Sequence, residues 1–122
     1  MAGKRVDTTY EDMLAFHLSA NGITYEREYK AISGRRYRWD FRIGKTLLVE
    51  VQGGTWSRER SGHSTGAGIR RDCEKSNIAV MNGYKVLYFT SDMVKSGEAI
   101  NTIIAMLDYL IGYPKLGIDT AA

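Results

Sequence analysis

Between residues 37 and 43, bulky apolar side chains alternate strictly with charged ones, and no other pattern in the chain limits the fold so closely. The segment reads Tyr37, Arg38, Trp39, Asp40, Phe41, Arg42 and Ile43. A repeat of two residues sends successive side chains to opposite faces of a strand, and a helix cannot produce it. We therefore predict a β-strand with an aromatic face in the core and a charged face, carrying Asp40, that is available for chemistry.

The rest of the chain predicts three more strands and three helices. Further strands are expected over residues 23–30, 47–52 and 84–90. Helices are expected from a Thr8 or Thr9 cap to Asn21-Gly22, over residues 67–81, and from about Ile100 onward, after a turn at residues 91–97. The order α-β-β-β-α-β-α predicts an α/β fold, in which a three-stranded meander is followed by a helical crossover to a fourth strand.

Length and composition indicate one ordinary globular domain. The chain has 122 residues, of which 43% are hydrophobic and 25% charged, with a single proline. We expect one domain over residues 1–122, and the composition argues against disorder or a disulfide scaffold. No apolar run of 18 residues and no secretory signal pattern is present, so neither a membrane span nor export is expected. The single thiol, that of Cys73, agrees with the reducing cytoplasm.

Positive charge is concentrated in the middle of the chain. Residues 35–75 contain 10 basic and 5 acidic residues, whereas the rest contains 7 basic and 9 acidic residues. A localised basic field suits a polyanion such as DNA, and it is equally compatible with a solvated surface. The candidate nucleic-acid contacts are arginines in or beside this segment: Arg35, Arg36, Arg38, Arg58, Arg60, Arg70 and Arg71.

Two acids on neighbouring predicted strands form the candidate site. If residues 44–46 form the connecting loop, Ile43 lies opposite Leu47, and counting back places Asp40 across from Glu50. Their Cβ atoms would then lie about 5 Å apart. Two carboxylates this close repel each other unless a divalent cation or a basic group lies between them, and hard oxygen ligands favour Mg²⁺ or Mn²⁺. The pattern therefore indicates a phosphodiesterase metal site, the alternative being that Asp40 pairs with a neighbouring arginine on an exposed sheet face.

The loop length decides whether the two acids meet. Gly44-Lys45 alone would make a good two-residue turn. That register moves Glu50 opposite Trp39 and sends the two carboxylates to opposite faces. Burying an unpartnered carboxylate among aromatic rings costs on the order of several kcal/mol. We therefore prefer the three-residue loop, or a bulge.

These residues, in this order of elements, resemble the PD-(D/E)XK nuclease superfamily, and more closely its small, stand-alone phage-type members. The resemblance covers about residues 8–92. It rests on residues 35–41 and 50–54, followed by His63, Gly66, Gly68, Asp72 and Lys75. It implies a restriction-endonuclease-like αβββαβ core with a mixed four-stranded sheet and an additional C-terminal helix. In two positions the chain departs from the family pattern, because Trp39 replaces the usual proline and Gln52 the usual lysine.

The resemblance also implies roles for individual residues. Asp40 and Glu50 would be ligands of Mg²⁺ or Mn²⁺, and Glu11 on the first helix would be an additional acid. Some superfamily members supply the missing lysine from the neighbouring helix, and Lys75 is our candidate for that role. Gln52 retains an amide that can orient a water molecule or bind phosphate.

An alternative for Lys75 is an ordinary ion pair with Asp72 or Glu74. The second helix carries a stripe at helical spacing, formed by Ile69, Cys73, Asn77, Val80 and Met81. Lys75 lies away from the Cys73 face of this helix.

The glycine-rich connection before the second helix is longer than usual. Residues 53–68 include five glycines, and loops of this length are mostly functional or disordered. His63 in this loop is a candidate general acid or phosphate contact. Trp56 would either stack on an exposed base or cover the edge of the core.

The sequence therefore predicts a Mg²⁺-dependent endonuclease that hydrolyses phosphodiester bonds of DNA. No separate domain remains to read a sequence, so a branched or four-way (Holliday) junction is the expected substrate, with sequence-specific nicking as the alternative. The wide apolar stripe of the last helix suggests a homodimer. Two alternatives stay open, a non-catalytic nucleic-acid binding module that retains the nuclease fold and a structural subunit of a phage particle.

Overall fold

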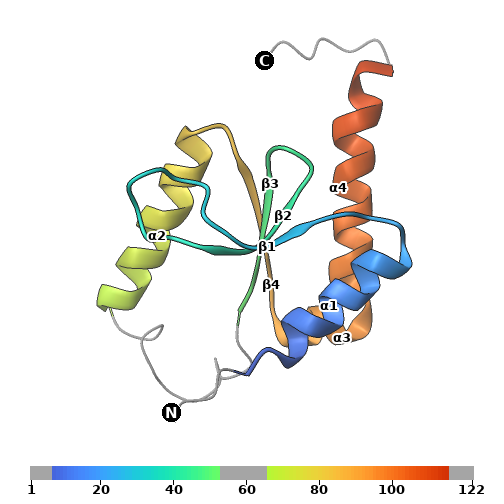
Figure 1. The fold of residues 1–122 in the computed structure, drawn as a ribbon, viewed down its shortest axis with the longest axis horizontal. Coiled ribbons are helices and arrows are strands. Elements are labelled where there is room, and N and C mark those ends of the chain that lie inside the picture. The colour runs from blue at the N-terminus through green and yellow to red at the C-terminus, as the bar shows by residue number, and fades with distance from the viewer. Residues whose placement is uncertain (1–6, 53–65, 116–122) are drawn as a thin grey trace.

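A mixed four-stranded sheet with helices on both faces forms the structure, a computed structural model that describes residues 7–52 and 66–115 (Figure 1). The elements are α1 (Thr9–Ala20), β1 (Glu26–Tyr29), β2 (Trp39–Ile43), β3 (Leu47–Val51), α2 (Gly66–Met81), β4 (Lys85–Phe89), α3 (Ser91–Ser96) and α4 (Glu98–Lys115). The strands lie in the order β1-β2-β3-β4, with antiparallel pairs up to β3 and a parallel pair between β3 and β4. The predicted α/β fold, with its meander, its helical crossover and its additional C-terminal helix, is confirmed.

One predicted turn is instead a short helix. Residues 91–96 form α3, because the Thr90 hydroxyl accepts a hydrogen bond from the Met93 N–H at 3.3 Å and so caps the first turn. Gly97 ends the helix with φ 89°, a left-handed conformation that glycine adopts without strain. The turn signals of the sequence therefore mark the ends of a helix.

The two faces of the sheet have separate cores. On one face, α1, α3 and α4 cover the larger core, and on the other face α2 covers a smaller one (Figure 1). The larger core includes Leu14, Phe41, Val49 and Ile103, each fully buried.

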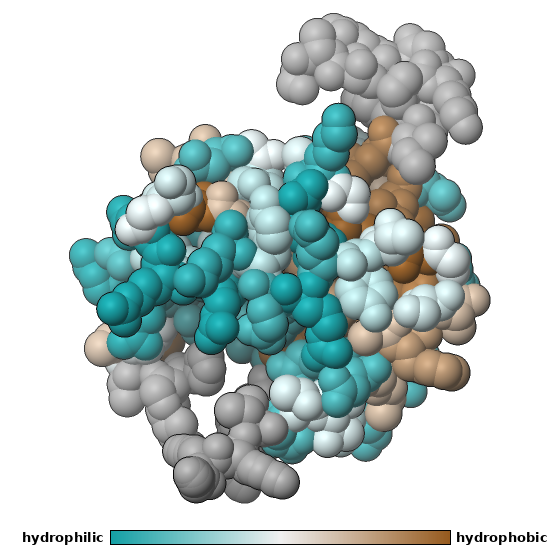
Figure 2. All heavy atoms as spheres, viewed as in Figure 1, coloured by the Kyte–Doolittle hydropathy of each residue, from teal (hydrophilic) through white to brown (hydrophobic). Residues whose placement is uncertain are grey.

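In the described residues, no helix is long and apolar enough to cross a membrane. Hydrophilic residues gather over β1 and its connection to β2, and hydrophobic residues show along α4 (Figure 2).

The prediction that the aromatic residues of β2 share one face is wrong. Phe41 lies in the larger core, whereas Trp39 packs with Ala79 of α2 in the smaller one. At the step between them, Asp40 lies opposite Glu28 in the register of β1 and β2. Glu28 itself has φ 54°, a left-handed rather than an extended conformation. Trp39 therefore belongs to the α2 side of the sheet.

Helix α2 packs on the sheet through a different side from the one its apolar stripe suggests. All five residues of the stripe are exposed in the structure, namely Ile69, Cys73, Asn77, Val80 and Met81. Gly68 and Ala79 are buried instead, and Lys75 is half-buried between the helix and the sheet. Small residues let the helix approach the sheet closely, and the ion pair of Lys75 described below fixes which side faces inward. In this helix the position of Lys75, rather than the apolar stripe, therefore determines which side faces the sheet.

Candidate active site at the ends of β2 and β3

The predicted register of the two acidic strands is confirmed. Ile43 pairs with Leu47, Arg42 with Leu48 and Phe41 with Val49, which is the register that the three-residue loop predicts. The same count brings Asp40 level with Glu50, and the charge of Asp40 acts on Glu50. The connecting loop has three residues and begins with Gly44 at φ 65°. The alternative register with a two-residue turn is therefore wrong.

Asp40 is fixed to the neighbouring strand by its side chain. Its Oδ2 atom accepts a hydrogen bond from the Val51 N–H at 2.7 Å. Burial raises the pKa of Asp40 and the nearby Glu28 carboxylate adds to the rise, whereas the Val51 bond, Lys75 and Arg27 lower it. The Asp40 carboxylate is thus held in one place, in an environment that disfavours its negative charge.

Glu50 forms an ion pair with Lys75 of α2, the helix that follows β3 in the chain. The Lys75 ammonium nitrogen lies 3.0 Å from Glu50 Oε1, and the two side chains are only 18% and 20% exposed. Burial raises the pKa of Glu50 to about 7, and Asp40 contributes to the rise while Lys75 opposes it. Lys75 is therefore not the ordinary solvent lysine of the alternative interpretation, and Glu74 pairs with Arg70 instead.

Glu11 lies close enough to Asp40 for its pKa to be affected, but it does not complete a group of metal ligands. Burial raises the pKa of Glu11, and the negative charge of Asp40 adds to the rise. Among the residues that the structure describes, however, no three His, Cys, Asp or Glu side chains are grouped closely enough to hold a metal ion. The predicted set of three carboxylate ligands is therefore not assembled, because Glu11 comes from α1 on one face while Glu50 is bonded to α2 on the other.

The chemistry of Asp40 and Glu50 nevertheless fits a hard divalent cation. Mg²⁺ in phosphate-processing sites takes one or two carboxylates and fills its other positions with water and phosphate oxygens. Both carboxyl groups lie on rigid strands, and both have a pKa raised mainly by burial. A cation between them would offset the cost of keeping both negative.

The other predicted catalytic residues are less informative. The Gln52 N–H donates to the Phe89 carbonyl at 2.7 Å, which extends the β3–β4 ladder by one residue, and Gln52 is half-buried next to the site. His63 and Trp56 lie outside the described residues, as do Arg58 and Arg60.

The remaining predicted arginines lie on the surface on the α2 side. Arg35, Arg36 and Arg38 are exposed on the connection from β1 to β2, which lies on the same side of the sheet as α2 (Figure 1). Arg38 pairs with Glu28 at 3.6 Å. Arg70 and Arg71 are exposed near the start of α2. The structure thus brings these five arginines to one side of the sheet.

Two residues near the site were not anticipated from the sequence. The Arg27 guanidinium lies 3.0 Å from Asp12 of α1 and 5.4 Å from the centre of the Phe41 ring, and its charge lowers the pKa of Asp40. Trp39 lies beneath the Lys75 ammonium, which is 4.9 Å from the centre of its ring. The sequence carries no clear signal for either placement.

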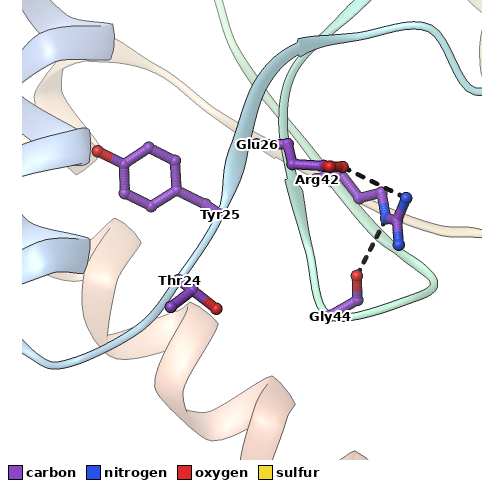
Figure 3. Close-up of a pocket in the computed structure, with 5 residues that line it drawn as sticks. All are labelled: Thr24, Tyr25, Glu26, Arg42 and Gly44. Carbon is purple, nitrogen blue, oxygen red and sulfur yellow. Dashed lines mark hydrogen bonds and ion pairs between the residues drawn. The ribbon is translucent and has the colours of Figure 1, made fainter.

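A pocket elsewhere on the sheet does not coincide with these acids. It has a volume of about 260 Å³ and lies at the turn end of β2, lined by Thr24, Tyr25, Glu26, Arg42 and Gly44 (Figure 3). Arg42 is already bonded there to Glu26 at 3.3 Å and to the Gly44 carbonyl at 3.0 Å. The charged groups of the pocket therefore satisfy one another, and the candidate active site is at the opposite end of the strand.

Comparison with known proteins identifies the fold. No protein-family model and no curated protein sequence matches the chain. A solved structure, the catalytic domain of the homing endonuclease I-Bth0305I, is similar to it with a TM-score of 0.63. The similarity covers 85% of this chain and 97% of that one, at 21% sequence identity. The chain therefore has the fold of a homing endonuclease catalytic domain, and membership of the PD-(D/E)XK superfamily stays a prediction.

Proposed function

We propose that the protein is a metal-dependent endonuclease that hydrolyses phosphodiester bonds in DNA with Mg²⁺ or Mn²⁺. The observation that carries this proposal is that Asp40 is bonded to the Val51 N–H, next to Glu50, with the Lys75 ammonium 3.0 Å from Glu50. Acid, acid and lysine are the groups that phosphodiester hydrolysis needs for cation binding and charge neutralisation. The similarity in fold to a homing endonuclease catalytic domain supports the same interpretation.

In this proposal Asp40 and Glu50 hold the ion, and Lys75 acts on the phosphate. When bound, a divalent ion supplies Lewis-acid activation of water and of the phosphoryl group. Hydrolysis joins a water oxygen to phosphorus and breaks a phosphorus–oxygen ester bond, so negative charge builds up on the phosphoryl oxygens. An ammonium group has three N–H donors, and Glu50 Oε1 accepts one hydrogen bond from Lys75. In this proposal the other donors of Lys75 stabilise the phosphoryl oxygens.

Around this centre, the exposed arginines on the α2 side would bind neighbouring phosphates without reading sequence. Gln52 would orient water or phosphate, Glu11 would add negative charge beside Asp40, and His63 remains the candidate general acid. A branched or four-way junction remains the proposed substrate, cut by a homodimer. Part of the α4 stripe that suggested this dimer is used within the chain, because Ile100 and Ile103 are buried in the larger core.

Incubation of the protein with supercoiled and four-way junction DNA, in Mg²⁺ or in EDTA, tests the proposal. Cleavage should require Mg²⁺. It should disappear in Asp40→Asn and in Glu50→Gln, while both variants keep their affinity for DNA. Cleavage that persists in EDTA, or that survives both substitutions, would show that the two acids are not the metal ligands of a nuclease.

A second candidate function is a nucleic-acid binding module without catalytic activity. The observation in its favour is that Lys75 already pairs with the Glu50 carboxylate at 3.0 Å, so Glu50 has a partner other than a cation. In that case the wild-type protein should bind DNA with a steep salt dependence and leave it uncut in Mg²⁺ and in Mn²⁺.

A further inference from the structure

The indole ring of Trp39 supports the Lys75 side chain from the side of the sheet. The ammonium nitrogen lies 4.9 Å from the ring centre, within the distance at which a cation is attracted to the face of an aromatic ring. We propose that Trp39 is a positioning residue, which holds the Lys75 ammonium in place against Glu50 so that its remaining donors can reach the phosphate. This inference rests on the proposed nuclease function.

Packing fixes the ring of Trp39 in its position. The residue is fully buried and lies in the smaller core between Leu48 of β3 and Ala79 of α2. The Tyr37 ring meets it edge to face, with centres 6.1 Å apart and an angle of 66° between the planes. Within the described residues, the indole N–H has no hydrogen-bond partner. Packing rather than a hydrogen bond therefore orients the ring, and it offers the lysine a rigid surface.

Lys75 needs such a surface because its side chain is long and flexible. A lysine has four rotatable bonds in its stem, and its charge can be presented in many directions. Here the side chain is only 18% exposed, with the ammonium held by Glu50 at 3.0 Å and by the Trp39 ring at 4.9 Å. Two contacts, from two adjacent strands, restrict the position of the ammonium group far more than the contact with Glu50 alone would. If DNA or a cation draws Glu50 away, the ring still keeps the charge at the site.

The alternative is that Trp39 only fills the core. Both interpretations predict a loss of stability when the ring is removed, so stability does not distinguish them. They differ in whether the effect of the ring depends on Lys75. A positioning role acts through Lys75 and disappears when the ammonium is absent, whereas core packing affects both backgrounds equally.

The test is a double-mutant cycle with the full chain, using Trp39→Leu, Lys75→Met and the double variant, at a temperature at which all are folded. With supercoiled plasmid in Mg²⁺, Trp39→Leu should lower kcat about tenfold and change KM less than about twofold. Trp39→Phe, which keeps an aromatic face, should recover most of this loss. In the Lys75→Met background, Trp39→Leu should have no further effect on kcat. An equal loss in both backgrounds, or an unchanged kcat in Trp39→Leu, would overturn the proposal.

A second measurement does not depend on activity. By NMR, the ε-methylene protons of Lys75 should be shifted upfield by the indole ring in the wild type. In Trp39→Leu that shift should disappear, and in Trp39→Phe it should be partly kept. The resonances of Lys95, which is exposed on α3, serve as the control and should not move. A Lys75 signal without an upfield shift in the wild type would refute the positioning role. If the wild type leaves DNA uncut yet shows the shift, the nuclease proposal fails while the contact itself stands.

Discussion

The ammonium nitrogen of Lys75 lies 3.0 Å from Oε1 of Glu50, although the two residues are 25 positions apart in the chain. The contact joins α2 to the centre of the sheet, next to Asp40 on the adjacent strand. It explains why the more polar side of α2 faces inward, and it places a positive charge beside two acids whose ionisation is disfavoured by burial.

Removing the charge of Lys75 should impair cleavage more than binding. We expect Lys75→Met to lower kcat by about 10²- to 10³-fold, because a preorganised cation no longer stabilises the phosphoryl oxygens. Lys75→Arg keeps the charge and should fall between this variant and the wild type. Single-turnover cleavage and a filter-binding assay measure the two effects. Lys95→Met, an exposed control on α3, should behave as the wild type. A Lys75→Met protein with wild-type kcat would remove this residue from the mechanism.

The folding stability of the metal-free protein should depend on pH through Glu50. Its pKa is raised from the ordinary value of 4.5 to about 7, so the folded state binds more protons than the unfolded state between these values. Stability should therefore fall as pH rises from 4.5 to 7, by at most about 3 kcal/mol, and then level off. Glu50→Gln should lose the contribution of Glu50 to this decrease and keep only those of Asp40 and Glu11, whose pKa values burial also raises, as measured by urea unfolding in EDTA.

The matched control for this experiment is Glu74→Gln, which affects an exposed carboxylate paired with Arg70 on the surface of α2. It should change stability by less than about 0.5 kcal/mol and leave the pH profile as in the wild type. Identical pH profiles for wild type and Glu50→Gln would mean that burial of Glu50 does not disfavour its charge.

The exposed arginines of the β1–β2 connection should contribute to DNA affinity through salt-dependent contacts. Arg35→Gln and Arg36→Gln should each reduce the slope of log affinity against log salt by about 1, with little effect on cleavage at saturating DNA. Fluorescence anisotropy at several salt concentrations measures the slope. Lys95→Gln provides the control on the other face of the sheet. Slopes that remain unchanged in both arginine variants would place the DNA elsewhere on the surface.

Local sequence patterns were sufficient to predict the four strands, every helix except α3, and the register of β2 and β3. The alternation in β2 and the cost of burying Glu50 together selected the correct loop length, which determines the register of both carboxylates. These effects are local in the sequence, because the register depends only on β2, on the loop that follows it and on β3. The predicted roles of these residues still await experiment.

What the sequence did not predict depends on contacts between distant segments. Helix α2 has an apolar stripe, yet it turns its small residues and Lys75 toward the sheet, because an ion pair with Glu50 is formed there. Trp39 lies on the α2 side, against the alternation of its own strand, and no motif signals that change. The two departures from the family pattern therefore meet at Lys75. Trp39 lies beneath its ammonium group, and in our proposal Lys75 replaces the lysine that is missing at Gln52.

Titration of the metal-free protein with Mn²⁺, followed by electron paramagnetic resonance, tests most directly whether Asp40 and Glu50 share a divalent cation. We predict one Mn²⁺ bound per chain in the wild type, and affinity weakened at least about tenfold in Asp40→Asn and in Glu50→Gln. Lys75→Met should still bind the ion. Wild-type affinity in both acid variants, or no Mn²⁺ binding by a wild-type protein that cleaves DNA in EDTA, would contradict the account.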